Sequence, residues 1–220
     1  MSIEPLASLD RSTLRERALD SVRSAIISGR YRPGDHLSEV ELATSLGVSR
    51  GTVREALRHL QQEGLVSAGN RGMLRVSSLT PVEVRELFQV RAALEGMAVR
   101  QIIASPRRRE AVGVLRAALE HLADEAEDFP ARIDADLAFH LQLCRLSGNS
   151  MLVQSWRHLE GRMRVAILNG AAWQAPMMAR DRHAPIVDAI EGADVAAALR
   201  IVDEHMASAA ERFAEATESA

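Results

Sequence analysis

Hydrophobic positions in the first third of the chain recur every three or four residues, which is the spacing of amphipathic helices. The pattern predicts helices over residues 14–27 and 39–46, and a third that runs from the cap residue Ser49 to about Glu63. Each of them ends close to a glycine, as helices commonly do. In the third helix the apolar positions form one stripe, made by Val53, Ala56, Leu57 and Leu60.

Two short apolar segments follow, residues 65–67 and 74–77, on either side of the turn-rich sequence Gly69-Asn70-Arg71-Gly72. Short apolar runs around such a turn predict a small hairpin. A helix, a short helix, a tight turn, another helix and a two-stranded hairpin follow each other in the order of a winged helix-turn-helix. Residues 1–78 are therefore expected to form a winged helix-turn-helix domain.

The remainder of the chain indicates helices only. It opens at Thr80-Pro81-Val82-Glu83, where Thr80 and Glu83 have the spacing of a capping box and Pro81 takes the first helical position. Proline, glycine and asparagine punctuation then predicts six helices, over residues 81–104, 106–127, 130–146, 150–168, 176–191 and 194–216. Short connections predict an antiparallel bundle for residues 79–220. The expected fold is mainly α, an N-terminal winged helix-turn-helix plus a C-terminal antiparallel six-helix bundle.

Composition excludes several classes of protein. Hydrophobic residues make up 47% of the chain and charged residues 26%, as in ordinary globular proteins, and all 27 cationic side chains are arginines. No apolar run approaches the ~18 residues that span a bilayer, and nothing resembles a signal peptide, so a cytoplasmic protein without a membrane partner is expected. The single cysteine, Cys144, excludes an internal disulfide framework and a zinc finger.

Candidate DNA-binding residues gather at the start of the third helix. The run Ser49-Arg50-Gly51-Thr52-Val53-Arg54 places two guanidinium groups and two hydroxyl groups in its first turn and a half. In a helix-turn-helix this part of the second helix faces base edges in the major groove, where arginine pairs with guanine. An ordinary solvated helix start is the alternative. Arg71, at the hairpin tip, is a candidate for a wing that contacts the minor groove or phosphates, or else a solvated turn residue.

These residues also carry a family resemblance, over the runs 29–35 (GRYRPGD), 37–43 (LSEVELA), 46–50 (LGVSR), 53–57 (VREAL) and 63–66 (EGLV). Together they closely resemble the GntR family of bacterial transcription regulators. The resemblance implies DNA contacts from the positions of Ser49, Arg50, Gly51, Thr52 and Arg54, with a wing glycine at Gly72. Two positions depart from the family pattern: Gly51 stands where a side chain is usual, and Val40 where some members have a base-contacting arginine.

Three histidines and one aspartate in the second half have spacings that suit a metal site. Asp136 and His140 are four residues apart on one predicted helix, so both side chains reach one point. His183 and His205 lie at similar depth on the last two helices, which a tight turn joins. Three imidazoles and one carboxylate suit zinc, nickel, manganese or a similar divalent ion. The alternative is a set of satisfied core histidines.

The same region resembles the FCD ligand-binding domain of the FadR subfamily, in its shorter, six-helix form. The matching residues are the run 136–140 (DLAFH), the run 147–149 (SGN) and the segment from His183 to His205. The resemblance implies metal ligands at Asp136, His140, His183 and His205, with open coordination positions that face an effector cavity. It also implies an arginine in that cavity at Arg91, whose alternative is a surface pair with Glu95. Arg164 is a weaker effector candidate of the same kind, and Cys144 is read as a small buried residue.

The function expected from the sequence is therefore that of a bacterial, metabolite-responsive transcription regulator, with repression as the favoured outcome. A homodimer is expected to bind a double-stranded, inverted-repeat operator, because such a repeat mirrors a protein two-fold axis. The helical domain is expected to bind a divalent metal, zinc foremost, and a small carboxylate metabolite. The chain is not expected to be an enzyme, since no HExxH motif or general base accompanies the histidines. Two alternatives stay open: a metal-dependent enzyme with a His3Asp site, and a purely structural metal.

Overall fold

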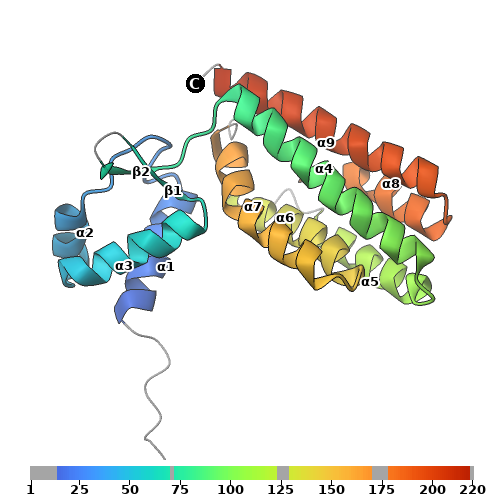
Figure 1. Cartoon of the computed structure of the whole chain (residues 1–220), viewed down its shortest axis with the longest axis horizontal. Helices are drawn as coiled ribbons and strands as arrows, with labels where there is room; N and C mark the ends of the chain where they lie inside the picture. Colours follow the sequence, from blue (N-terminus) through green and yellow to red (C-terminus); the bar gives the residue numbers. More distant parts are fainter. Residues whose placement is uncertain (1–13, 70–71, 123–128, 170–177, 219–220) are drawn as a thin grey trace, which may run out of the picture.

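The structure of the chain is a computed structural model, which describes residues 14–69, 72–122, 129–169 and 178–218. In these ranges it contains nine helices and one two-stranded sheet, divided between two bodies (Figure 1). The mainly α architecture predicted from the sequence is confirmed. The predicted division after residue 78 lies in the connection between the last strand and the long helix that follows.

The first body consists of α1 (Leu14–Ile27), α2 (Glu39–Leu46), α3 (Arg50–Gln62), β1 (Val66–Ala68) and β2 (Leu74–Val76). The predicted stripe of α3 is fully buried against α1 and α2. Gly47 ends α2 with a positive φ of 64°, a conformation that glycine adopts without strain, and so makes the tight turn into α3. β1 and β2 are antiparallel with Val66 opposite Val76, which confirms the predicted hairpin.

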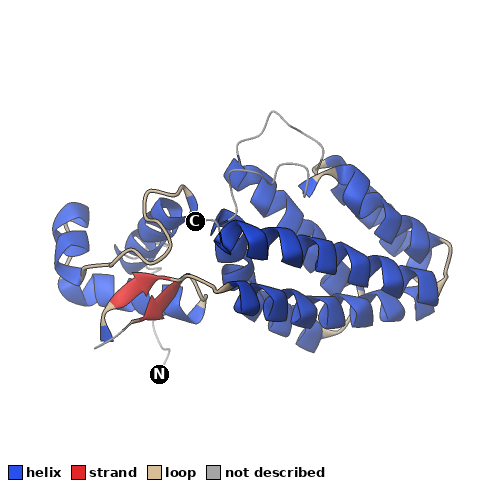
Figure 2. Ribbon diagram, turned by 90° about the horizontal axis from the view of Figure 1, so that it is seen from above, coloured by secondary structure: helices blue, strands red, loops and turns tan. Residues whose placement is uncertain are grey.

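The second body is helical only (Figure 2), with α4 (Pro81–Ala104), α5 (Arg108–Glu120), α6 (Phe129–Leu146), α7 (Ser150–Asn169), α8 (Arg180–Glu191) and α9 (Val195–Glu218). The predicted capping box at the start of α4 is present, with Thr80 and Glu83 each accepting a backbone hydrogen bond from the other. The two longest helices, α4 and α9, pack side by side along most of their length. In the described part of the chain, no helix is long and apolar enough to cross a membrane.

The bounds of several helices differ from the predicted ones by one or two residues, and those of α5 and α8 differ by more. α5 begins at Arg108, two residues later than expected, because Ser105 takes an extended conformation before Pro106 and a turn intervenes. α5 ends at Glu120, before a turn, and its predicted last residues, 123–127, lie outside the described residues. α8 begins at Arg180, four residues later than predicted, and the first two of those four also lie outside the described residues. None of these differences changes the order of the helices.

Candidate functional site

Six polar side chains are buried together inside the apolar core of the helical domain. They come from four helices: Arg91 and Glu95 from α4, Asp136 and His140 from α6, His183 from α8 and His205 from α9. None is more than 9% exposed. Buried polar and charged groups are stable only where they satisfy each other or bind an ion, so the cluster is a candidate site.

The imidazoles of His140, His183 and His205 meet at the centre of this cluster. Each offers a ring nitrogen, and these atoms lie within 4.8 Å of one another. The Nε2 atoms of His140 and His183 are 3.1 Å apart, and Nε2 of His183 is 3.0 Å from Oδ1 of Asp136. The structure thus brings together the four residues that the sequence singled out, from three different helices.

The outer ring nitrogens of two of these histidines fix which tautomer is present. Nδ1 of His183 lies 2.9 Å from the carbonyl oxygen of Ala179, and Nδ1 of His140 lies 2.6 Å from Oε2 of Glu95. A carbonyl and a carboxylate accept hydrogen bonds, so each Nδ1 must be the donor. Both Nε2 atoms then carry lone pairs that face each other at 3.1 Å. Such a pair needs a positive centre between its atoms, either a proton or a metal ion.

Burial disfavours an added proton on two of the three imidazoles. It lowers the pKa of His140, because a buried imidazolium loses its hydration. Burial and the neighbouring imidazoles of His140 and His183 lower the pKa of His205 well below its ordinary value. Burial alone would raise the pKa of Asp136, but the 3.0 Å contact with Nε2 of His183, which holds a positive centre between the two atoms, and the buried charge of Arg91 keep it below the ordinary range. Neutral imidazoles and an ionised carboxylate are the forms that bind metals.

Glu95 connects the cluster to two further side chains. Its carboxylate accepts hydrogen bonds from Nδ1 of His140 at 2.6 Å, from Nε of Arg91 at 2.7 Å and from Nε1 of Trp156 at 3.1 Å. Burial would raise the pKa of Glu95, but His140 and Arg91 lower it overall. The carboxylate therefore stays charged and orients His140, which is how outer carboxylates commonly act on metal-binding histidines.

From the sequence, Glu95 was expected at most to form a surface pair with Arg91. The pair is formed, but its predicted surface location is wrong, since the side chains of Glu95 and Arg91 are only 0% and 3% exposed. A signal was present in the spacing of α4. Its buried stripe runs through Val84, Phe88, Arg91, Glu95, Ala98 and Ile102, so two charged residues occupy core positions of an amphipathic helix.

The two predicted effector arginines lie in different surroundings. Nη2 of Arg91 is buried 3.9 Å from Oδ2 of Asp136, and within the described residues it has no hydrogen-bond partner. Arg164 instead forms an ion pair with Asp134 on α6, at 2.5 Å. No contact found among the described residues joins Arg164 to the histidine cluster. Cys144 is buried as expected, and burial raises the pKa of its thiol to about 12.

The predicted DNA-binding residues occupy the exposed start of α3. Oγ of Ser49 accepts a hydrogen bond from the Thr52 backbone at 3.1 Å and lies 2.9 Å from its hydroxyl, so the predicted cap is formed. Arg50 and Gly51 are exposed beside it. Arg54 is also exposed, but its guanidinium forms two hydrogen bonds with Glu39 of α2, at 3.0 and 2.8 Å.

The second predicted contact surface, the wing, is described only in part. Gly72 has a φ of 75°, which suits its place in the turn between β1 and β2. Arg71 lies outside the described residues.

A winged helix-turn-helix joined to a helical domain is an architecture of DNA-binding transcription regulators. Residues 14–76 match the family model described as "Bacterial regulatory proteins, gntR family", and residues 86–208 match the FCD domain. The chain therefore belongs to the GntR family, and its FCD domain fits the FadR-type subfamily.

Several proteins of known name are similar over most of the chain. The probable D-xylose utilization operon transcriptional repressor of Paenarthrobacter nicotinovorans is 32% identical, over 91% of this chain and 88% of its own. The gluconate operon transcriptional repressor of Bacillus licheniformis is 30% identical, over 73% and 66%. Among solved structures, a putative GntR regulator from Rhodococcus sp. RHA1 is 27% identical with a TM-score of 0.68, covering 90% of this chain and 96% of its own.

A further solved structure, E. coli McbR/YncC, shares the fold with a TM-score of 0.70 at 22% identity, over 93% of this chain and 98% of its own. The family models and these relatives describe transcription regulators, so the chain is a regulator with a DNA-binding domain and an effector domain, and not an enzyme. The alternative of a metal-dependent enzyme is thereby overturned.

Proposed function

We propose that the chain is a metabolite-responsive repressor that binds operator DNA through α3 and holds a divalent metal ion, together with a small organic acid, in its helical domain. The observation that carries the proposal is that the Nε2 atoms of His140 and His183 face each other 3.1 Å apart in a buried core. Repression is supported by two relatives that are named as repressors.

The residues of the cluster fit a metal ion by their chemistry and spacing. Asp136, His140, His183 and His205 would hold it, and nitrogen and carboxylate ligands suit zinc, nickel or manganese. Two ligand atoms that are each about 2.0–2.1 Å from one tetrahedral zinc ion lie about 3.3 Å apart. The separations of 3.1 Å between the two Nε2 atoms and 3.0 Å from His183 to Asp136 agree with that spacing. When bound, the ion would supply a positive centre for an anionic effector.

Arg91 favours a carboxylate as the effector's polar group. Its Nη2 is buried beside the proposed metal ligands without a hydrogen-bond partner among the described residues. A guanidinium donor in such a place binds a carboxylate strongly, because the hydrogen bond is charge-assisted. The B. licheniformis relative is named for a gluconate operon, and gluconate is a small carboxylate. A small organic acid is therefore the proposed effector class, with Arg91 as its main contact and Arg164 as the lesser candidate.

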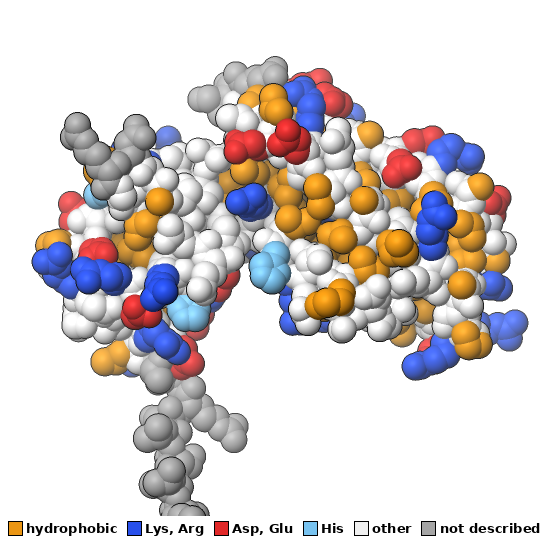
Figure 3. Space-filling view, viewed as in Figure 1, with side chains coloured by type: hydrophobic (Ala, Val, Ile, Leu, Met, Phe, Trp, Pro, Cys, Tyr) orange, Lys and Arg blue, Asp and Glu red, His pale blue; other side chains and the backbone are white. Residues whose placement is uncertain are grey.

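A homodimer on an inverted-repeat operator agrees with the surface of α4. Val82, Val90 and Met97 are 60%, 50% and 48% exposed and lie eight and seven residues apart, so they share one face of the helix. Figure 3 shows hydrophobic side chains gathered over this part of the helical domain. An exposed apolar face of this kind commonly packs on a second copy, and a two-fold dimer matches an operator of two half-sites.

The dimer is proposed to have one arrangement that binds the operator and another that does not. The effector binds these two arrangements with different affinity, so effector binding and DNA binding are thermodynamically linked. Operator affinity must then change by the factor by which DNA changes effector affinity. Candidate organic acids titrated into an operator-binding assay test this. Unchanged DNA affinity with every acid that binds the helical domain contradicts it.

Arg50→Ala tests the recognition surface. If Arg50 contacts a base, the substitution should weaken operator binding by ~1–3 kcal/mol and relax sequence preference at one position; if it contacts a phosphate, all DNA should bind more weakly with a flatter salt dependence. The measurement is the dissociation constant for a duplex selected by the protein and for a scrambled duplex, at several salt concentrations. Arg200→Ala is the control, because Arg200 is 66% exposed on α9. Equal operator affinity for wild type and Arg50→Ala refutes both roles.

A further inference from the structure

α7 touches the histidine cluster through Trp156. The Trp156 side chain is fully buried, and its Nε1 donates a hydrogen bond of 3.1 Å to Oε1 of Glu95. The other oxygen of Glu95 accepts from His140 at 2.6 Å. One carboxylate therefore separates a proposed metal ligand from α7, and a change in the position of His140 must alter the partner of Trp156.

The same helix touches the end of the recognition helix α3 through Gly161. A Cβ atom at Gly161 would lie 1.6 Å from the carbonyl oxygen of Glu63, the residue that follows α3. Only glycine permits such an approach of two backbones. Val165, one turn further along α7, is 1% exposed and belongs to the apolar core of the DNA-binding body. α7 thus rests directly on the last residues of the recognition helix.

Glu63 is also fixed within the DNA-binding body. Its carboxylate forms two hydrogen bonds with Arg23 of α1, at 3.1 and 2.7 Å. A displacement of Glu63 by α7 would therefore move α1 and α3 together, as one rigid unit.

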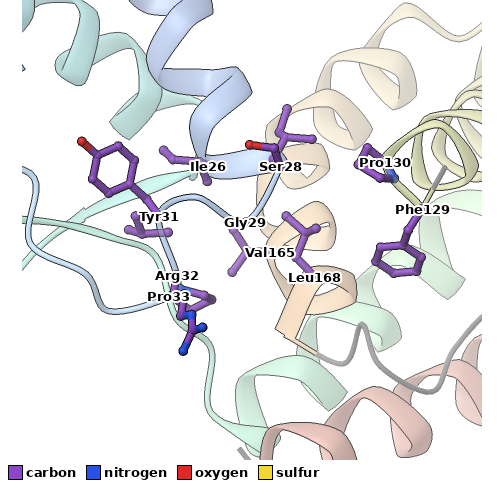
Figure 4. A pocket seen from close by; sticks show the side chains of 12 residues that line it. Ile26, Ser28, Gly29, Tyr31, Arg32, Pro33, Phe129, Pro130, Val165 and Leu168 are labelled. Atoms are coloured by element: carbon purple, nitrogen blue, oxygen red, sulfur yellow. The ribbon is translucent and has the colours of Figure 1, made fainter. Parts of the chain in front are cut away.

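Beside this tight contact, the packing between the two bodies is open. A cavity of about 380 Å³ lies between them, lined on one side by Ile26, Tyr31 and Val76 and on the other by Pro130, Val165 and Leu168 (Figure 4). The junction thus combines one backbone pivot, at Gly161 and Glu63, with free space in which the bodies can change their relative orientation.

We infer that α7 couples the histidine cluster to the recognition helix, with Trp156 as its contact to the cluster and Gly161 as its pivot on α3. The inference rests on the proposed metal site, because the signal begins at His140. Trp156 and Gly161 are five residues apart, about 7.5 Å along a helix. Over that length a helix moves as a rigid body, so a shift at Trp156 becomes a shift of Glu63 and of α3.

The first test compares Gly161→Ala with Gly113→Ala in the full chain. A methyl group at Gly161 must displace Glu63, whereas one at Gly113, which is also helical, meets no atom within 4 Å. Zinc affinity is measured by chelator competition, and affinity for a duplex selected by the protein is measured with zinc and with chelator. In wild type and Gly113→Ala, the DNA affinity with zinc and the DNA affinity with chelator should differ by about fivefold or more. Gly161→Ala should bind zinc within about twofold of wild type while the ratio of its two DNA affinities falls toward one.

The second test needs no change at the junction. Hydrogen exchange of the wild-type backbone should respond to zinc in residues 60–66 at the end of α3. Trp156→Phe, which removes the indole donor together with part of the ring volume, should reduce that response. The coupling is overturned if Gly161→Ala keeps the wild-type ratio of DNA affinities with zinc and with chelator, or if bound zinc does not change wild-type exchange in residues 60–66. Neither result contradicts the proposed metal site. A wild type that binds no zinc overturns the proposed site and the coupling with it.

Discussion

Glu95→Ala will lower the free energy of unfolding by about 3–5 kcal/mol, because it leaves the guanidinium of Arg91 buried without its carboxylate partner. Arg91 is 2% exposed, and its Nε donates to Glu95 at 2.7 Å. Trp156 and His140 lose their acceptor in the same step. The measurement is urea unfolding with chelator present, so that loss of metal binding does not contribute.

Glu110→Ala is the matched control for this loss. Glu110 forms an ion pair with Arg107 at 2.8 Å, but the two side chains are 62% and 77% exposed. Exposed pairs contribute little, so this variant should unfold within about 1 kcal/mol of wild type. If Glu95→Ala loses no more stability than Glu110→Ala, the buried network does not have the role that its geometry indicates.

Glu95→Gln separates the shape of this side chain from its charge. The amide oxygen can still accept from Arg91 and Trp156, but the amide nitrogen then faces Nδ1 of His140, and two donors cannot pair. His140 must accept at Nδ1 and carry its proton on Nε2, which removes a metal-binding lone pair. We expect a folded protein whose zinc affinity is reduced by about 10–100-fold, the usual effect of changing an outer partner of a metal ligand. Zinc affinity equal to that of wild type would contradict this assignment.

The fold and the proposed ligand set could be predicted because they are encoded in local spacing. Three features depend only on residues a few helical turns apart at most: the stripe of α3, the capping box at Thr80 and the four-residue interval from Asp136 to His140. The alignment of His183 with His205 required only that one short turn joins two antiparallel helices.

The features that were missed depend on contacts distant in sequence. Glu95 meets His140 and Trp156 across 45 and 61 positions, and Arg54 meets Glu39 across 15. Gly161 carries no periodic signal, because its importance comes from the backbone of another body pressed against it. Hydrophobic periodicity shows which face of a helix is buried, but it does not show which polar groups meet there.

Zinc will raise the free energy of unfolding of the metal-free protein by about 4 kcal/mol when free zinc is ~1,000 times its dissociation constant. The gain follows because the native state gathers His140, His183 and His205 within 4.8 Å, whereas the unfolded chain does not. In His183→Ala the increment should fall to near zero at the same zinc concentration, since one lone pair of the facing pair is lost.

The increment, rather than the absolute stability, is the quantity to compare, because removal of a buried imidazole also leaves a cavity with its own cost. His158→Ala is the control: His158 is exposed on α7, and its hydrogen bond within the described residues is a local one with the Gln154 carbonyl, so this variant should keep the full increment. An equal increment in His183→Ala and His158→Ala would place zinc elsewhere. If the wild type stays folded in chelator and its DNA affinity differs between zinc and chelator, the ion has a regulatory role. If the wild type unfolds in chelator, the ion has a structural role and holds α6, α8 and α9 together.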